Sequence, residues 1–309
     1  MARRPWNRPD IDAYAQSFDL PPATGGFAVT FLGVASLLID DGETQILTDG
    51  FFSRPGLRKV GFGRIAPDPE RIDACLARAG ATRVGAVAPV HSHFDHALDS
   101  AHVAAKTGAT LVGGPSTANL GRGGGLPDHQ IRSVADGDTF EVGAFALDFV
   151  VSRHCPPDRF PGQIDEPFVP PAKAAAYKCG EAWSIMIRHA GGRRMLVQGS
   201  AGFVEDSLTD HTAEVAYLGV GQLGKQDDAY IRSYWQHTVR AVGAMQVVLI
   251  HWDDFFRPLD RPLRALPHAG DDLDHTMQVL TALADADGVA LHFPNVWQPE
   301  DPWASGQPG

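Results

Sequence analysis

The stretch that decides the fold is VGAVAPVHSHFDHALDS, residues 84–100, in which a run of small and apolar residues leads directly into histidines and an aspartate. The run 84–90 has the composition of a buried strand. His91, His93, Asp95 and His96 then follow within six residues. On extended backbone, residues i and i+2 point to the same side, so His91 and His93 can converge on one metal ion. The turn that follows directs Asp95 and His96 towards a second metal ion. This HxHxDH motif therefore predicts a metal site at the end of the strand.

The composition is that of a folded, acidic chain. Its 309 residues are 44% hydrophobic, and 26 Lys+Arg against 37 Asp+Glu give a net charge of −11. A field of this sign repels nucleic-acid phosphates and anionic membrane surfaces, which disfavours the nucleic-acid-binding class. The 3 cysteines form no CxxC pair, which argues against a disulfide framework and favours a reducing compartment. We expect a cytoplasmic protein with no membrane span, because no stretch approaches the roughly 18 uninterrupted apolar residues that a span needs.

Strand-like and helix-like segments are interspersed along the chain. Asp68 as N-cap, Pro69 at the first helical position and Gly80 as terminator predict one helix. Apolar residues at helical spacing predict two more, over 230–239 and 273–283. Strands are predicted at 27–33, 35–40, 44–49, 84–90, near 110, at two places between 130 and 152, and at 182–189, 193–200, 214–221, 245–252 and 288–293. Strands that come in meanders, with helices not alternating one for one, predict an α/β (α+β) fold of two packed sheets flanked by helices.

We expect one domain, because no linker, internal repeat or low-complexity tract divides the chain. A polar, proline-rich arm over residues 1–26 precedes a domain over 27–294, and a tail covers 295–309. Within the domain, HCPPDRFPGQIDEPFVPPAK (154–173) is much longer than a routine connection. Such a length indicates a functional loop at the active site or a disordered insert.

The position of HSHFDH after a buried strand, preceded by the meander VTFLGVASLLIDDGETQILTDG (29–50), resembles the metallo-β-lactamase superfamily. The resemblance extends over about residues 27–293. Among the branches of the superfamily, the chain looks most like the one that contains ascorbate-phosphate lactonases and N-acyl phosphatidylethanolamine phospholipase D. The resemblance implies an αββα sandwich, with two mixed β-sheets flanked by helices and a one- or two-metal hydrolytic site at one edge.

The resemblance also implies ligands beyond the motif. His154 in VVSRHCPP and His251 in VVLIHWDD each follow a predicted strand and match the third and the last histidine of the family pattern. The implied ligand sets are His91, His93 and His154 for a first metal, and Asp95, His96 and His251 for a second.

One position departs from the family pattern. Where the family commonly places a metal-bridging aspartate, in a motif like GDTG, this chain has Ser200 in Gly199-Ser200-Ala201-Gly202. A neutral hydroxyl is a poor metal ligand and supplies no charge to hold two divalent cations close together. Ser200 therefore predicts a weakened second site or a single metal.

Four further residues are weaker candidates for contacts to the substrate or to a ligand imidazole. Asp253 and Asp254 follow His251, and Asp49 ends a predicted strand. A carboxylate at these places would fix the tautomer of a metal-bound imidazole, and a solvated turn is the alternative. Tyr177 is a candidate for substrate contact from its position near the long loop alone.

The predicted function is metal-dependent hydrolysis of a small molecule: a lactone, an ester or amide, or a phosphodiester. Zn²⁺ is the expected cofactor, as one or two ions, with Mn²⁺ or Fe²⁺ as alternatives. The metal would lower the pKa of bound water to about 7 and so supply hydroxide at neutral pH. Asp95 and His251 are the predicted catalytic residues, Asp95 orienting the hydroxide and His251 carrying protons if only one metal binds. Two alternatives remain: an iron-dependent redox enzyme, and a binding protein that has lost turnover because of Ser200.

Overall fold

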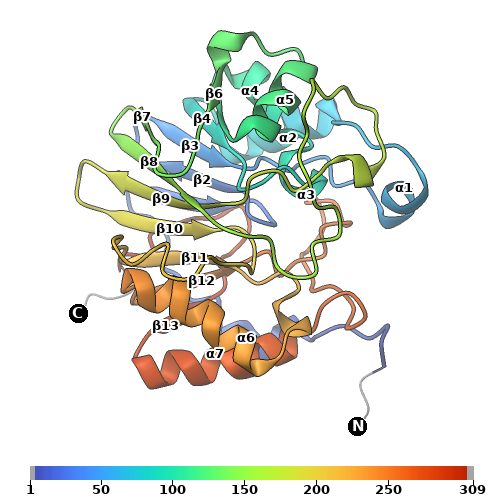
Figure 1. The fold of residues 1–309 in the computed structure, drawn as a ribbon. Coiled ribbons are helices and arrows are strands. Elements are labelled where there is room, and N and C mark those ends of the chain that lie inside the picture. Colours follow the sequence, from blue (N-terminus) through green and yellow to red (C-terminus); the bar gives the residue numbers. More distant parts are fainter. Residues whose placement is uncertain (1–3, 305–309) are drawn as a thin grey trace.

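Two seven-stranded sheets form the centre of the computed structural model, which describes residues 4–304 (Figure 1). The first sheet has the order β14-β1-β2-β3-β4-β5-β6, and the second has the order β13-β12-β11-β10-β9-β8-β7. In the first sheet, β1 to β3 pair antiparallel and β3 to β6 pair parallel. The second sheet repeats this pattern, with β7 to β10 antiparallel and β10 to β13 parallel. The predicted fold class, two mixed sheets with helices, is confirmed.

The elements have the following bounds. The first sheet comprises β1 (Ala28–Phe31), β2 (Leu37–Asp40), β3 (Gln45–Thr48), β4 (Val84–Ala88), β5 (Thr110–Gly113), β6 (Ile131–Ser133) and β14 (Pro299–Glu300). The second comprises β7 (Thr139–Val142), β8 (Phe145–Val151), β9 (Trp183–His189), β10 (Arg194–Gln198), β11 (Val215–Gly219), β12 (Gln246–Ile250) and β13 (Ala290–His292). The α-helices are α1 (Leu57–Phe62), α2 (Pro69–Ala79), α3 (Phe94–Ala97), α4 (Ser100–Thr107), α5 (Pro115–Gly123), α6 (Asp228–Trp235) and α7 (Leu273–Asp287). Short 3₁₀ segments are η1 (Ile11–Ser17), η2 (Asp128–Gln130), η3 (Ala174–Ala176) and η4 (Leu223–Lys225), and η5 (Gln236–Arg240) is a π-helical continuation of α6.

Apolar side chains fill the space between the sheets and the space under the helices. Phe31, Ile185 and Val197 belong to the cluster between the two sheets, and each is completely buried. The helices α2, α4 and α5 lie over the first sheet, and α6 and α7 lie over the second (Figure 1). Burial of this apolar surface is the main term that holds the four layers together.

The helix predicted between Asp68 and Gly80 is confirmed as α2. The Asp68 carboxylate accepts a hydrogen bond from the backbone N–H of Arg71, and Gly80 ends the helix at φ 66°. The structure differs from the prediction elsewhere: three strands, not two, lie between residues 130 and 152, and the first of them, β6, belongs to the other sheet. The pattern did not predict α5, whose Gly121 and Gly123 disfavour helix, because it forms by packing against β5 and β6.

The strands of the second sheet bring distant segments to one edge. β8 is antiparallel to β9, which is antiparallel to β10, and β10 is parallel to β11 and β12. β8, β10 and β12 therefore run in the same direction. The residues that follow them, His154, Ser200 and His251, share the edge where these strands end.

The N- and C-terminal segments lie together at the edge of the first sheet beside β1. β14 pairs with β1, and Pro22 forms a bridge with Glu300. The Glu300 carboxylate is buried and accepts hydrogen bonds from the backbone and side-chain N–H groups of Asn295. Parts of the predicted arm and tail, residues 1–3 and 305–309, lie outside the described residues. None of the helices within residues 4–304 is long and apolar enough to cross a membrane.

Glu300→Gln should reduce the pH dependence of stability. Burial raises the pKa of Glu300 from 4.5 to about 7, against the lowering effect of the Asn295 hydrogen bonds. The stabilisation by the protonated form is therefore complete below about pH 4.5 and is lost as the pH rises through 7. In urea denaturation, Glu300→Gln should gain on the order of 1–2 kcal/mol relative to wild type at about pH 8. The exposed-site variant Glu43→Gln is the control, and an equal gain there would contradict the assignment.

Candidate metal centre

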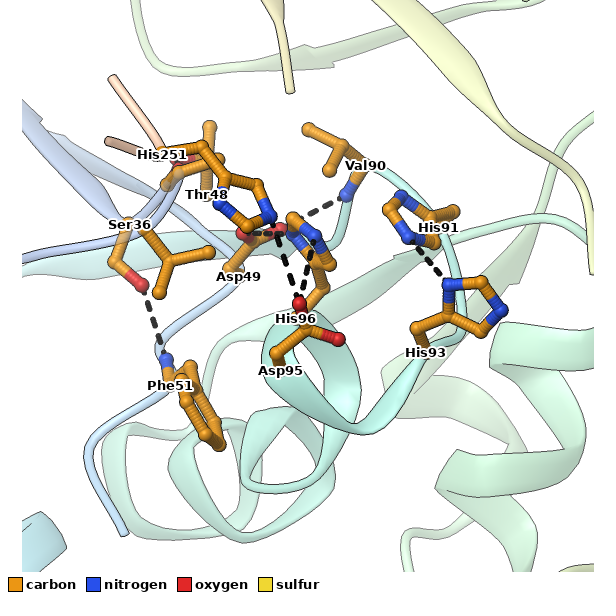
Figure 2. A network of polar contacts seen from close by, with 12 residues as sticks. Ser36, Thr48, Asp49, Phe51, Val90, His91, His93, Asp95, His96 and His251 are labelled. Carbon is orange, nitrogen blue, oxygen red and sulfur yellow. Dashed lines mark hydrogen bonds and ion pairs between the residues drawn. The ribbon is translucent and has the colours of Figure 1, made fainter. Parts of the chain in front are cut away.

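The HSHFDH motif forms the turn that leads from β4 into α3, and its imidazoles are buried. His91, His93 and His96 are 1%, 5% and 0% exposed, so each side chain is almost completely withdrawn from water. Figure 2 shows the rings of His91 and His93 on one side of His96, with His251 and Asp95 on the other. The motif thus contributes to two adjacent groups of polar side chains.

The first group joins the motif to the end of β8. One ligand atom from each of His91, His93 and His154 lies within 4.8 Å of the others. His91 Nε2 is 3.1 Å from His93 Nδ1, and the His154 ring centroid is 4.7 Å from that of His93. The structure therefore brings together the three residues predicted for a first metal.

The second group joins the motif to the end of β12. Ligand atoms of Asp95, His96 and His251 also lie within 4.8 Å of one another. An Asp95 oxygen is 3.7 Å from His96 Nε2 and 3.5 Å from His251 Nε2. The His91 and His96 ring centroids are 4.0 Å apart, so the two groups adjoin and can hold two cations side by side.

Asp49 fixes the orientation of His96. One Asp49 oxygen lies 2.6 Å from His96 Nδ1, and the other accepts the backbone N–H of Val90 (Figure 2). The opposite nitrogen, His96 Nε2, is buried and has no hydrogen-bond partner among the described residues. A buried, unpaired imidazole nitrogen directed at a carboxylate fits a metal ion, which would supply the missing partner. The residues present therefore fit a metal, with Asp49 holding the outer nitrogen as predicted for a metal-bound histidine.

The outer nitrogens of two other histidines are also held. His154 Nδ1 lies 2.7 Å from the Cys155 carbonyl oxygen. His93 Nε2 lies 3.4 Å from the Phe160 carbonyl oxygen and 3.3 Å from an Asp158 oxygen, both in the long loop. These contacts direct His154 Nε2 and His93 Nδ1 towards the first group.

The electrostatics of the two groups differ. Burial, followed by the neighbouring imidazoles, lowers the pKa of His91 and brings that of His154 to about 4, so both rings are neutral at pH 7 with lone pairs available. Burial alone would raise the pKa of Asp95, but His96 and His251 outweigh it and keep the carboxylate ionised. The pKa of His96 is raised, because Asp49 and Asp95 outweigh its burial. The second group therefore contains an ionised carboxylate, Asp95, that can bind a cation.

Ser200 lies beside the first group. Its hydroxyl accepts a hydrogen bond of 3.0 Å from the backbone N–H of Cys155, the residue that follows His154. Ser200 thus holds the backbone at His154 and brings no charge to the site. The Cys155 thiol is buried, which raises its pKa to about 12, so it stays protonated at neutral pH.

Asp253 does not make the contact with the His251 imidazole that the sequence predicts. It supports the His251 backbone instead. Its carboxylate accepts the N–H of Val34 at 2.8 Å, and the Val34 carbonyl accepts the N–H of His251 at 2.7 Å. The other Asp253 oxygen forms an ion pair with Arg54, and both side chains are completely buried. Val34, Arg54 and His251 all have positive φ angles, of 54°, 40° and 59°. These contacts hold a strained backbone that places His251 in the site.

Asp254 and Tyr177 have other surroundings. The Asp254 carboxylate forms ion pairs of 3.0 Å with Arg8 and with Arg264, so it binds arginines where an imidazole contact was predicted. Tyr177 is 1% exposed and packs against Phe168 in an apolar cluster. Neither side chain is among the two groups of ligand atoms. Arg54 and Val34, by contrast, were not candidates, because a single arginine or valine in a loop gives no sequence signal.

A cavity of about 430 Å³ opens beside His154. Its walls include the cation of Arg153, the carboxylate of Glu205 and the aromatic rings of Phe203 and Tyr230. The two rings lie 5.4 Å apart, centroid to centroid. The cavity is therefore large enough for a small organic molecule next to the first ligand group.

Two solved structures share the arrangement of sheets and helices. A possible metal-dependent hydrolase from Veillonella parvula DSM 2008 superposes with a TM-score of 0.54 at 14% identity, covering 89% of this chain and 99% of that one. CmlA, a diiron β-hydroxylase from Streptomyces venezuelae, superposes with a TM-score of 0.53 at 14% identity, covering 89% of this chain and 54% of that one. In both comparisons the likeness is one of fold. The chain shares the fold of these two proteins.

Sequence comparison gives a shorter match. A UPF0173 metal-dependent hydrolase of Heliobacterium modesticaldum is 30% identical over 101 residues, which is 33% of this chain and 35% of that protein. The chain thus matches about a third of the length of this curated relative. No family model matches the chain. The roles of the site residues are therefore inferred from the geometry of this chain.

Asp253→Ala should loosen the second ligand group selectively. The change leaves the buried Arg54 cation unpaired and frees the Val34 N–H that supports His251, so the free energy of unfolding should fall by about 3–5 kcal/mol. We expect metal affinity at Asp95, His96 and His251 to fall about 10–100-fold, measured by titration with Co²⁺ absorbance, while the first group is retained. Asp254→Ala, whose arginine partners are partly exposed, is the matched control. Equal losses of metal in both variants would rule out this role.

Proposed function

We propose that this protein is a metal-dependent hydrolase of the metallo-β-lactamase superfamily that acts on a small molecule. The observation that supports this most is the adjacency of the two ligand groups, His91, His93 and His154 beside Asp95, His96 and His251. Imidazoles and carboxylates are ligands that Zn²⁺ takes at hydrolytic sites. The relative from Heliobacterium modesticaldum carries the description metal-dependent hydrolase, in agreement with this proposal.

The residues have distinct roles in the proposed reaction. A bound Zn²⁺ would lower the pKa of a water molecule to about 7 and polarise a carbonyl or phosphoryl oxygen. Asp95 stays ionised, so its carboxylate would accept a hydrogen bond from the water, orient it and relay its proton to His251. His251, 3.5 Å from Asp95, passes that proton on when it is not a metal ligand. Asp49 keeps the His96 ring in one tautomer throughout.

The substrate class is proposed from the site and its surroundings. A lactone, an ester or amide, or a phosphodiester fits a cavity of about 430 Å³ beside His154. The branch we propose is that of ascorbate-phosphate lactonases and N-acyl phosphatidylethanolamine phospholipase D, which the sequence resembles. One or two Zn²⁺ ions are proposed, with Mn²⁺ or Fe²⁺ as alternatives, and the cytoplasm is the proposed location.

An iron-dependent oxidising enzyme is the second candidate function. The observation that favours it is the shared fold with CmlA, a diiron β-hydroxylase. Iron content of the purified protein, an iron absorbance band and oxygen consumption would support this candidate. Zinc content and turnover of esters or lactones without oxygen would support the hydrolase. The third alternative is a binding protein that has lost turnover because Ser200 replaces an aspartate. Such a protein would turn over none of these substrates.

His93→Ala should abolish metal retention and turnover together. His93 is a member of the first group, and loss of one ligand should lower metal affinity more than about 100-fold, because removal of even an outer partner costs about 10–100-fold. Metal content by mass spectrometry and a screen of lactones, esters and phosphodiesters are the measurements. His129→Ala, at an exposed histidine, is the control. A His93→Ala protein with unchanged metal content would refute the assignment.

Ser200→Asp should strengthen the second site. An aspartate keeps an acceptor for the Cys155 N–H and adds a negative charge beside the ligand groups. We expect the variant to bind a second equivalent of Zn²⁺ at least about 10-fold more tightly than wild type. The measurement is calorimetric titration of protein from which a chelator has removed the metal. Ser200→Asn, which has the same shape without the charge, separates charge from packing. If both variants bind alike, charge at this position does not limit the second site.

A further inference from the structure

Large apolar side chains are exposed on two neighbouring segments, α1 and the long loop. Of the six exposed large apolar residues within 4–304, Leu57 and Phe62 of α1 are 63% and 93% exposed, and Val169 of the loop is 69% exposed. The segments are joined by a β-bridge between Ile65 and Ala172, with backbone hydrogen bonds of 2.7 and 3.0 Å. Figure 1 shows α1 at the outer edge of the molecule. The name α1 surface is used below for seven exposed residues: Leu57, Arg58, Lys59, Phe62, Arg64, Val169 and Lys173.

The cations around these side chains have no acidic partners. Arg58, Lys59 and Lys173 are exposed and form no ion pair among the described residues, and Arg64 donates only to the Pro171 carbonyl. Residues 55–67 contain three basic residues and no acidic one, in a chain with a net charge of −11. The acidic pair at 165–166 lies on the part of the loop that is hydrogen-bonded to α5.

The α1 surface is anchored from inside and leads towards the metal centre. Val60, Ile65 and Phe168 pack into one buried cluster that also contains Phe94 and Phe255. The Phe255 ring contacts His251, with centroids 5.8 Å apart. The exposed residues therefore stand on a packed base, and one apolar cluster extends from them to the second ligand group.

Local charge decides which partner such a surface binds. Charges are screened over about 8 Å at physiological ionic strength, so the acidic remainder of the chain has little effect on what approaches α1. Apolar side chains surrounded by unpaired cations are complementary to a surface of hydrocarbon and anionic headgroups. A second copy of the chain fits less well, because a stable dimer needs about 20–30 residues from each partner and the α1 surface has seven.

We propose that the α1 surface docks the protein on phospholipid membranes that carry net negative charge. Leu57, Phe62 and Val169 enter the boundary of the acyl chains, and the cations contact phosphate groups. The protein lies on the membrane and does not span it. This inference concerns attachment and is independent of the proposed hydrolase activity.

Vesicle co-sedimentation of the full chain tests the proposal. Wild type should bind vesicles of phosphatidylcholine mixed with phosphatidylglycerol, bind pure phosphatidylcholine at least about fivefold more weakly, and dissociate from the mixed vesicles at high salt. Phe62→Ser should lower the partition coefficient about tenfold or more, and Arg58→Ser about fivefold. No binding by wild type, or equal binding to both vesicle types, would overturn the proposal.

Matched variants elsewhere on the chain control for a general change in apolarity or charge. Met245→Ser removes another exposed apolar side chain, 54% exposed, and Arg232→Ser removes an exposed cation of α6. Both should bind vesicles like wild type, and a loss equal to that of Phe62→Ser would overturn the proposal. Phe62→Ser is at a 93% exposed site, so thermal unfolding should be unchanged. A wild-type dimer that Phe62→Ser dissociates, without vesicle binding, would assign the surface to a second copy instead.

Discussion

Burial of the imidazoles of His91, His93 and His96, each no more than 5% exposed and packed against one another, is the constraint on which the rest of this structure depends. Burial and mutual repulsion keep the first group neutral, whereas the carboxylates of Asp49 and Asp95 favour charge on His96. Such a cluster is costly unless each outer nitrogen has a fixed partner. The Asp49 carboxylate, directly after β3, supplies this partner for His96, and the Phe160 carbonyl of the long loop supplies it for His93.

The fold meets this constraint by ending several strands at one edge. β8, β10 and β12 run in the same direction in the second sheet, and β3 and β4 are parallel in the first. Loops that leave such an edge turn sharply, and the left-handed backbone at Asp49 and His251 is the local cost. The buried Arg54–Asp253 pair is part of the structure that offsets this cost at His251. Strain and the ligand site are thus consequences of the same turns.

The surface proposed to bind membranes follows the end of β3, which also carries Asp49. The chain leaves β3 through Asp49 and reaches α1 a few residues later, so the apolar cluster beneath α1 adjoins the ligand groups. A protein with net charge −11 can present a basic, apolar surface there because screening makes charge a local property. Position relative to the sheets, and not total composition, therefore decides what each face binds.

The sequence by itself determined the strand before HSHFDH, the capped helix from Asp68 and the polar residues of the motif, because period, caps and strand ends are local properties. His154 and His251 were candidates through the family resemblance. The tertiary structure alone decided how Asp253 is used: it binds Arg54 and Val34 and not an imidazole, since its partners are about 200 residues away in the chain. It also decided that α5 is a helix, through packing that outweighs its glycines. Local propensities predict elements and motifs, whereas the direction in which a buried carboxylate points depends on which distant donor the fold brings to it.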